Sequence, residues 1–221
     1  GFGSIKNKMS EKILHQGAEA NIILIKPRDR EPFIIKDRVK KSYRLPQIDE
    51  EIRFRRTKAE AKLLEKSSQI INCPEPFFEP SIKNSSKLKM PFIDGERLSD
   101  FLDSFPLERQ KEICKAIGTE TAKLHDANII HGDLTTSNMI FVEKTGKVFF
   151  IDFGLGFSSH KIEDKAVDLH LLRQALEAKH FRNWQALFSE FLKGYKNSKN
   201  SNLVLQQLKK VDARGRYKER Y

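Results

Sequence analysis

A polar run near the middle of the chain carries the side chains that phosphoryl transfer needs. It reads His131-Gly132-Asp133-Leu134-Thr135-Thr136-Ser137-Asn138, and Ile151-Asp152-Phe153-Gly154 follows it. Asp133 can accept the proton of an attacking hydroxyl, whereas Asn138 and Asp152 can hold Mg²⁺ against the phosphates of a nucleotide. Strand-like runs at 139–142 and 148–151 lie between the two motifs. Their order and spacing predict a phosphotransferase site; the alternative is two acidic turns that flank a hairpin.

A lysine in the first third of the chain is the expected partner of the nucleotide phosphates. Lys36 ends the strand-like run Phe33-Ile34-Ile35-Lys36, where an inward-facing ammonium could neutralise the α and β phosphates. Such a lysine needs a carboxylate to fix its position, and Glu60, in the middle of a predicted helix, is the best candidate. Glu50, Glu51 and Glu65 compete with it. The alternative for each of these side chains is a solvated charge.

The phosphate loop is expected between the first two strands, at Gly17-Ala18-Glu19-Ala20. It retains a single glycine, yet the backbone amides of residues 18–21 could point at phosphate oxygens. Glu19 would repel phosphate directly. It is therefore expected to order the loop or to meet metal or water.

Adenine is expected at a hinge that follows the strand ending in Met90. The carbonyl of Pro91 and the amide of Ile93 have the right spacing, and Pro91 need only accept. Apolar side chains would sandwich the ring, with plain core packing as the alternative. Those expected around the nucleotide are Ile22 or Ile23, Ile34, Ile140 and Ile151.

Hydrophobic periodicity predicts strands in the first part of the chain and mostly helices after it. The expected strands are 11–16, 21–26, 33–39, a stretch around Ile82, and 88–93. The expected helices are 48–67, 98–105, 107–127, 165–179, 184–195 and 203–211.

This order predicts an α+β, bilobal, protein-kinase-like fold. Residues 9–93 would form a small β-rich N-lobe with one main helix, and 94–211 a reduced helical C-lobe that lacks an activation segment. A cleft between two such lobes is a usual place for a nucleotide. Residues 1–8 are expected to be a tag remnant or a disordered start, with Met9 a plausible native start, and 212–221 a basic tail.

Three departures around the catalytic run predict a reduced kinase site. Gly132 replaces an arginine that, in many kinases, grips a phosphorylated activation loop, and the stretch from Asp152 to Asp168 is too short for such a loop. Thr135 stands where protein kinases usually carry a lysine, so the hydroxyls of 135–137 could substitute in part. His131 is expected to pack beneath the loop, and Asp168 to anchor it; the alternative for Asp168 is a helix-start acid.

Composition limits the class of protein and the kind of partner that can be expected. The chain has 221 residues, 38% hydrophobic and 32% charged, and a formal net charge of +11. The charge favours an anionic partner such as nucleic acid, an acidic protein or nucleotide phosphates, with a generically basic surface as the alternative. Cys73 and Cys114 are isolated from each other in the sequence, as expected for thiols of an intracellular protein. No membrane span is expected.

Nearly the whole chain resembles one family, the PRPK-type small atypical serine/threonine kinases, which are the kinase subunits of KEOPS (EKC) complexes. The residues that carry the resemblance are Gly17-Ala18-Glu19-Ala20, Lys41-Ser42-Tyr43-Arg44-Leu45-Pro46, Arg56-Thr57-Lys58-Ala59-Glu60-Ala61, 131–140, 151–156 and the Arg214-Gly215-Arg216 tail. Generic kinase motifs alone would not single out this family. Departures are the polar residues 83–87 and the ending 217–221.

The resemblance implies ATP and Mg²⁺ as cofactors, weak autophosphorylation and an ATPase-like role. It implies binding to the threonylcarbamoyl-transferase subunit and other KEOPS subunits, with tRNA reached through the complex, which makes threonylcarbamoyladenosine. The tail, with Arg214 and Arg216, would lie near the transferase and tRNA; a solvated, disordered end is the alternative. The compartment would be the cytoplasm, and also the nucleus in a eukaryote.

Other classes of protein use similar motifs. Small-molecule kinases of the aminoglycoside or choline kinase type share the catalytic run, but they usually add a large substrate-binding insertion to the helical lobe. RIO-type kinases are a more distant option. A scaffold with a vestigial site is opposed by the intact set of Lys36, Glu60, Asp133, Asn138 and Asp152.

Overall fold

The computed structural model describes residues 9–77 and 85–218. By its internal contacts the chain divides into two units, residues 1–65 with 74–92 and residues 66–73 with 93–221. The expectations for residues 1–8 and for a strand around Ile82 fall outside the described residues. Within the described ranges, no helix is both long and apolar enough to cross a membrane.

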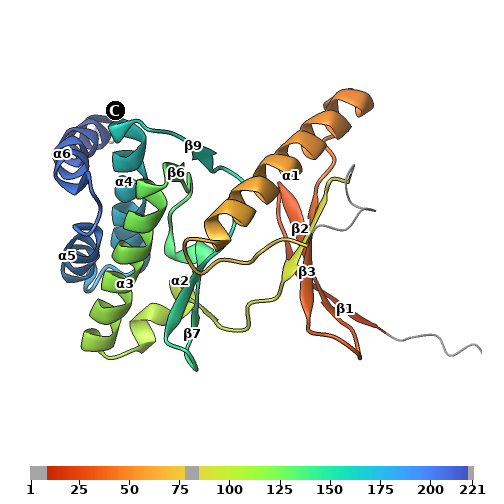
Figure 1. Ribbon diagram of the computed structural model, residues 1–221, viewed down its shortest axis with the longest axis horizontal. Coiled ribbons are helices and arrows are strands. Elements are labelled where there is room, and N and C mark those ends of the chain that lie inside the picture. Colours follow the sequence, from red (N-terminus) through yellow and green to blue (C-terminus); the bar gives the residue numbers. More distant parts are fainter. Residues whose placement is uncertain (1–8, 78–84, 219–221) are drawn as a thin grey trace, which may run out of the picture. The chain divides into compact units, whose positions relative to one another are not determined.

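The N-terminal unit is an antiparallel sheet with one long helix. Its strands are β1 (Ser10–Gln16), β2 (Ala20–Lys26), β3 (Phe33–Arg38) and β4 (Lys87–Pro91), in the spatial order β1-β2-β3-β4. Helix α1 (Pro46–Ser68) lies across one face of this sheet (Figure 1).

The strand register decides which side chains share the face toward α1. Ile22 lies opposite Lys36, and Ile34 opposite Met90. Directly opposed residues of antiparallel strands point to the same side of a sheet, and so do alternate residues of one strand. These four side chains therefore share a face, whereas Ile23, opposite Ile35, is on the other one. Of the two isoleucines left open by the sequence, Ile22 is the one on the side of Lys36.

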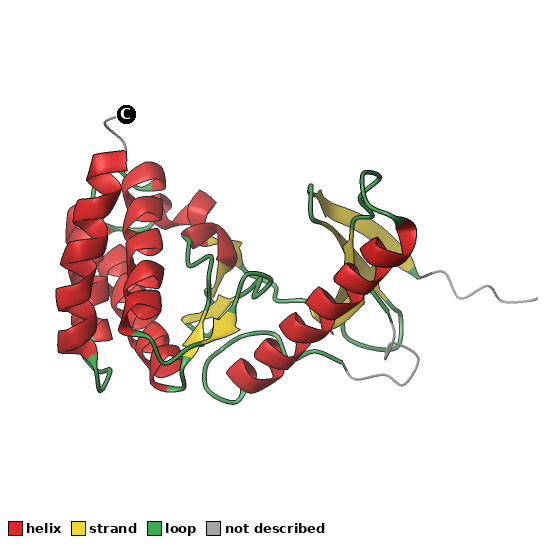
Figure 2. Ribbon diagram, turned by 90° about the horizontal axis from the view of Figure 1, so that it is seen from above, coloured by secondary structure: helices red, strands yellow, loops and turns green. Residues whose placement is uncertain are grey.

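The C-terminal unit is mostly helical, with short strands (Figure 2). Helix α3 packs against α5, and α4 against α6. Its elements in chain order are β5 (Glu96–Arg97), α2 (Leu98–Phe101), η2 (Leu102–Ser104), α3 (Leu107–Asp126), β6 (Ile129–Ile130), η3 (Thr136–Asn138), β7 (Met139–Val142), β8 (Lys147–Phe150), β9 (Phe157–Ser158), α4 (Ile162–Lys179), α5 (Trp184–Tyr195) and α6 (Ser201–Lys218).

Two glycines allow α3 and α5 to approach closely. A Cβ atom at Gly118 would lie 2.0 Å from the carbonyl oxygen of Phe191, and one at Gly194 would lie 2.1 Å from that of Lys115. Since such distances are impossible for a real side chain, each position requires glycine. Phe191 and Tyr195 are then fully buried against α3, and this apolar packing forms the core of the unit.

Two of the predicted helices differ more than the others from the structure in their bounds. The helix expected over 98–105 is a short α-helix followed by a 3-10 turn. The last helix does not end at Val211, because α6 continues to Lys218. Asp212 is held at 2.6 Å by His170, and Arg214 forms an ion pair with Glu163. These contacts to α4 come from far along the chain, so local sequence does not reveal them.

Candidate active site

The lysine and the glutamate expected to pair do so in the N-terminal unit. Lys36 Nζ lies 2.9 Å from Glu60 Oε1, and both side chains are buried. Arg38, which the sequence reasoning missed, shares the glutamate: its Nη2 lies 2.6 Å from Glu60 Oε2, and its Nε donates to Thr57 Oγ1 at 3.2 Å. One buried carboxylate therefore holds two cations from alternate positions of β3. That spacing of two places both on one strand face, and it was the available signal for Arg38.

The loop between β1 and β2 is ordered by its own acidic residue. Glu19 pairs with Lys41 at 3.4 Å and with Arg56 at 3.6 Å. Its carbonyl also accepts from Val39 N at 2.9 Å. Of the roles considered for Glu19, ordering the loop is the one that these contacts support. The two cations also offset the negative charge of Glu19 beside the position expected for phosphate.

A second buried carboxylate fixes the segment between β3 and α1. Asp49 accepts from the backbone of Lys41 at 3.1 Å and from Arg53 Nε at 2.7 Å, while Arg44 lies 3.5 Å away. Burial raises the pKa of Asp49, but the hydrogen bonds from Arg53 and Lys41 and the charges of Arg53 and Arg44 outweigh it, so the net pKa is lowered. The carboxylate therefore stays ionised and holds the start of α1.

The expected base and metal ligand are adjacent in the C-terminal unit. Asn138 Nδ2 donates to Asp133 Oδ2 at 2.9 Å and to the Asp133 carbonyl at 3.0 Å. His131 packs beneath this loop, with its ring 4.6 Å from that of Phe153. Its Nδ1 accepts from Asp133 N at 3.2 Å, so Nε2 carries the proton donated to the Ile151 carbonyl at 2.9 Å. Histidine thus ties the two catalytic motifs together.

Asp168 anchors the loop from α4, as expected. Its Oδ2 accepts from His131 N and its Oδ1 from Gly132 N, both at 2.9 Å. His125 Nε2 adds a third hydrogen bond at 2.9 Å, and Tyr195 donates to the other ring nitrogen at 2.8 Å. Burial is the main cause that raises the pKa of Tyr195, so its hydroxyl remains a donor. Three donors on one buried carboxylate fix the backbone that precedes Asp133.

Backbone geometry explains why this loop has glycine where many kinases have arginine. Gly132 has a φ of 82°, and a Cβ there would lie 2.1 Å from the Leu155 carbonyl. The chain after Gly154 turns back at once, since β9 pairs with β6 and α4 begins at Ile162. No activation segment fits there. An arginine is therefore excluded by space as well as by conformation.

Asp152 is held in an uncommon backbone conformation. Its φ is 58°, its side chain is exposed, and its Oδ1 accepts from Gly154 N at 3.2 Å. Aspartate tolerates this region better than most residues, yet the conformation is costly, and such costs are concentrated at functional sites.

Thr136 cannot take the role considered for the loop hydroxyls. It is buried, and its Oγ1 lies 2.9 Å from His180 Nε2. The His180 Nδ1 lies 2.9 Å from Asp103 Oδ1. Thr136 therefore supports the loop from behind, and among the three hydroxyls only Thr135 and Ser137 remain candidates for substrate contact.

The residues expected to bind a metal, Asn138 and Asp152, suit Mg²⁺ only together with a nucleotide. In the described part of the chain, no cluster of three or more His, Cys, Asp or Glu residues could hold an ion by itself. Because Asn138 uses its nitrogen toward Asp133, its amide oxygen is the end available to a metal. Amide and carboxylate oxygens suit Mg²⁺, which usually takes its other ligands from phosphate and water.

The remaining nucleotide-binding candidates have these places. Pro91 ends β4 opposite Phe33, and Ile93 begins the second unit. Ile140 lies in β7, and Ile151 follows β8, its amide donating to the Asn138 carbonyl at 2.9 Å. Gly17 N donates to the Ala20 carbonyl at 3.0 Å, which closes the β1–β2 turn.

The two basic residues of the expected tail lie on the last turns of α6. Arg214 is engaged with Glu163, as described above, and Arg216 is exposed. Basic residues at a helix C-terminus are favourable to the helix by themselves. Arg216 is therefore the better placed of the two for an external partner.

The fold and these motifs define a protein kinase. Residues 9–171 match the family model described as protein kinase domain. Among relatives, the KEOPS complex subunit Bud32 of Pyrococcus abyssi is 41% identical over 95% of this chain and 97% of its own length. A probable serine/threonine-protein kinase BUD32 homolog of Archaeoglobus fulgidus is 34% identical over 94% of this chain and 97% of its own. The chain belongs to the Bud32 family of protein kinases, which confirms the kinase family expected from the sequence.

Longer relatives contain this family as one part. A probable bifunctional tRNA threonylcarbamoyladenosine biosynthesis protein of Methanococcus vannielii is 39% identical over 96% of this chain, which spans 37% of that protein. The protein is thus a kinase whose relatives occur both as separate chains and within larger ones.

Proposed function

We propose that the chain is the ATP-dependent kinase and ATPase subunit of a KEOPS complex that supports threonylcarbamoyladenosine modification of tRNA. The observation that carries the proposal is the presence of two half-sites, Lys36 with Glu60 and Asp133 with Asn138. They occur in a chain with near full-length similarity to a KEOPS subunit.

Each half-site has a distinct task in this proposal. Lys36, held by Glu60, neutralises the α and β phosphates of ATP, while Asn138 and Asp152 hold Mg²⁺. The ion supplies charge neutralisation at the phosphates when bound. Asp133 orients the attacking hydroxyl and accepts its proton at Oδ2, the oxygen that already accepts from Asn138. Phosphoryl transfer needs mainly such positioning and charge.

The nucleophile is either a serine or threonine hydroxyl or water. Thr135 replaces the lysine that protein kinases usually use on the transferred phosphate, which favours slow protein phosphorylation and leaves room for ATP hydrolysis. The segment after Gly154 offers no activation loop, so control is assigned to a partner protein.

Nucleotide recognition uses the remaining candidates. The backbone carbonyl of Pro91 and the amide of Ile93 meet adenine, and the amides of residues 18–21 face the phosphates. The apolar contacts to the ring come from Ile22, Ile34, Met90, Ile140 and Ile151. Ile22, Ile34 and Met90 share the sheet face of Lys36, which supports this assignment.

The partners in this proposal are the threonylcarbamoyl-transferase subunit, other KEOPS subunits and, through them, tRNA. The exposed basic end of α6, with Arg216, is the assigned contact. Deleting residues 214–221 should weaken partner-dependent or tRNA-dependent activity more than ATP binding, and an equal loss of both would argue against this contact.

ATP turnover by the isolated chain, with and without the transferase subunit and tRNA, tests the proposal. We expect strong stimulation by the subunit, and loss of Mg²⁺-dependent turnover in Asp152→Ala with an unchanged circular dichroism spectrum. Turnover indifferent to the subunit, together with robust phosphorylation of a small alcohol, would favour a small-molecule kinase instead.

A further inference from the structure

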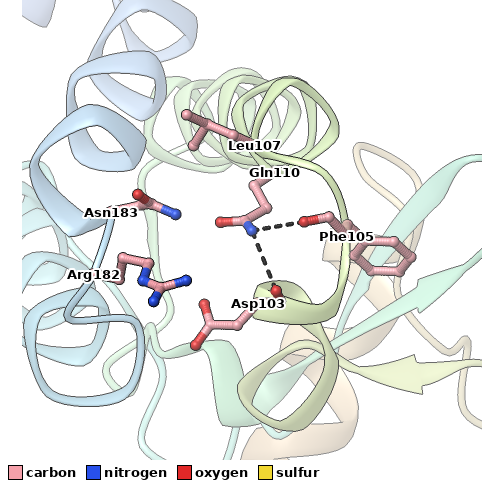
Figure 3. A pocket seen from close by; sticks show the side chains of 6 residues that line it. All are labelled: Asp103, Phe105, Leu107, Gln110, Arg182 and Asn183. Atoms are coloured by element: carbon pink, nitrogen blue, oxygen red, sulfur yellow. Dashed lines mark hydrogen bonds between the residues drawn. The ribbon is translucent and has the colours of Figure 1, made fainter.

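A cavity of about 410 Å³ lies in the C-terminal unit (Figure 3), and none of the residues that line it belongs to the catalytic motifs. It is formed where the start of α3 meets the turn between α4 and α5. Its volume is in the range of small-ligand sites. The six lining residues are Asp103, Phe105, Leu107, Gln110, Arg182 and Asn183.

Gln110 presents a buried acceptor to this cavity. Its side chain is only 3% exposed, and Nε2 donates to the Phe105 carbonyl at 2.8 Å and the Asp103 carbonyl at 3.5 Å. These carbonyls fix the amide orientation, so Oε1 is the free end, and Figure 3 shows it directed toward Asn183. Within the described chain, Oε1 has no hydrogen-bond partner. A buried acceptor without a donor is costly, so it points to a ligand that supplies an N–H.

Two donors stand on the opposite wall. Asn183 is at the N-cap position of α5, yet its side chain makes no capping hydrogen bond. Arg182 is exposed and forms no ion pair with any other described residue. Both can therefore donate to a carbonyl, while Phe105 and Leu107 add an apolar wall.

The charges of the cavity favour a neutral ligand over an anion. One carboxylate, Asp103, and one guanidinium, Arg182, both line it (Figure 3). A phosphate attracted by Arg182 would meet the carboxylate as well. A peptide group offers an N–H and a carbonyl without net charge, and the cavity is reachable from solvent, since Asp103 is 57% exposed along its side chain.

We propose that this cavity binds the main chain of an extended peptide segment from a protein partner. The segment donates an N–H to Gln110 Oε1, and its carbonyl accepts from Arg182. A side chain of the segment packs on Phe105 and Leu107. The site is separate from the nucleotide chemistry, and its occupancy does not depend on the kinase assignment.

Binding at this site should change the orientation of a side chain in the catalytic loop. Asp103 Oδ1 is 2.9 Å from His180 Nδ1, and His180 Nε2 is 2.9 Å from Thr136 Oγ1. Since the carboxylate can only accept, Nδ1 carries the proton and Thr136 donates to Nε2. A shift of Asp103 therefore reorients a side chain that lies between Asp133 and Asn138.

Saturation-transfer NMR on the full chain, with N-acetyl-leucine N-methylamide as the probe, tests the proposal. We expect weak saturable binding, in the millimolar range expected of so small a ligand. Gln110→Met should weaken it at least about tenfold, and Arg182→Gln should weaken it without affecting the fold, because this side chain is exposed. Lys209→Gln, in the groove between α5 and α6, and Asp152→Ala should bind as the unchanged chain does.

Three outcomes would overturn the site. They are no saturation of the unchanged chain, equal binding by Arg182→Gln, and stronger binding of N-acetyl-leucine or of a uridine trinucleotide than of the neutral amide. The loop connection has its own readout, the methyl resonance of Thr136. It should shift on probe binding, and binding without that shift would overturn the connection alone.

Discussion

The two units of this kinase position their proposed catalytic residues by different physical means. In the N-terminal unit the inner side of α1 is mostly polar, and the buried side chains Asp49, Thr57 and Glu60 meet cations of the sheet and of α1 itself. In the C-terminal unit, α3 and α5 pack through aromatic and aliphatic side chains, and a single buried carboxylate, Asp168, then fixes the catalytic loop.

Buried ionic contacts and apolar packing contribute differently to the stability of the two units. Buried ion pairs often add little net stability, because desolvation offsets their attraction, whereas apolar packing stabilises directly. The Lys36–Arg38–Glu60 cluster therefore serves mainly to hold a lysine in place, at a neutral or unfavourable cost in stability. Asp168 serves both purposes, since three N–H groups depend on it.

Removing Asp168 should have the largest effect. Asp168→Ala leaves the donors of His131, Gly132 and His125 without their acceptor inside the core, which should lower the free energy of unfolding by about 4–5 kcal/mol. Urea unfolding followed by circular dichroism measures this, with the Asp164→Ala change, at a less buried position on the same helix, as a milder comparison. A loss below about 1 kcal/mol would show that the loop is held by other contacts.

Changing the N-terminal cluster should separate stability from function. Glu60→Leu leaves two buried cations around an apolar side chain, and should cost about 3 kcal/mol. The triple change Lys36→Met, Arg38→Met, Glu60→Leu should recover most of that loss, because well-packed apolar groups often replace a buried ionic cluster without penalty. It should remain inactive in ATP turnover. A triple variant less stable than Glu60→Leu would contradict this view of the cluster.

Lowering the pH should destabilise the N-terminal unit, because Asp49 becomes protonated. Its pKa in the folded protein is lowered from the ordinary value of 3.8. The stabilisation is present above that value and is lost as the pH falls through the folded pKa, where Asp49 becomes protonated. Thermal unfolding from pH 6 to about pH 3 should therefore be less pH-dependent in Asp49→Asn than in the unchanged chain. Parallel curves would assign the acid sensitivity to other carboxylates.

The contrast between apolar packing and buried polar contacts also decides how much of the molecule could be predicted from its sequence. The helix expected over 107–127 is observed as Leu107–Asp126, because its apolar stripe reports directly on packing. The pairing of Lys36 with Glu60 was predictable from catalytic need. Arg38 was missed, since burial of arginine is rare and no chemistry demands it.

Other features depend on contacts between distant segments. The extension of α6 beyond Val211 rests on His170 and Glu163, and the two-residue strands β6 and β9 exist only because they pair with each other. Gln110 and His180 show no motif in the sequence. Their roles follow from the placement of an amide and an imidazole that only the folded chain defines.

We propose that Lys36 and Asp133, which lie in two differently built units, serve one phosphoryl-transfer step. The most direct measurement is Mg²⁺-dependent ATP turnover by Lys36→Met, Asp133→Asn and the double variant, each in complex with the transferase subunit. Each single change should reduce turnover by roughly a hundredfold or more. The double variant should turn over ATP almost as fast as the less active single variant, because the effects of residues that act on one step are not additive. Near-normal turnover in either single variant, or losses that multiply fully, would contradict the claim.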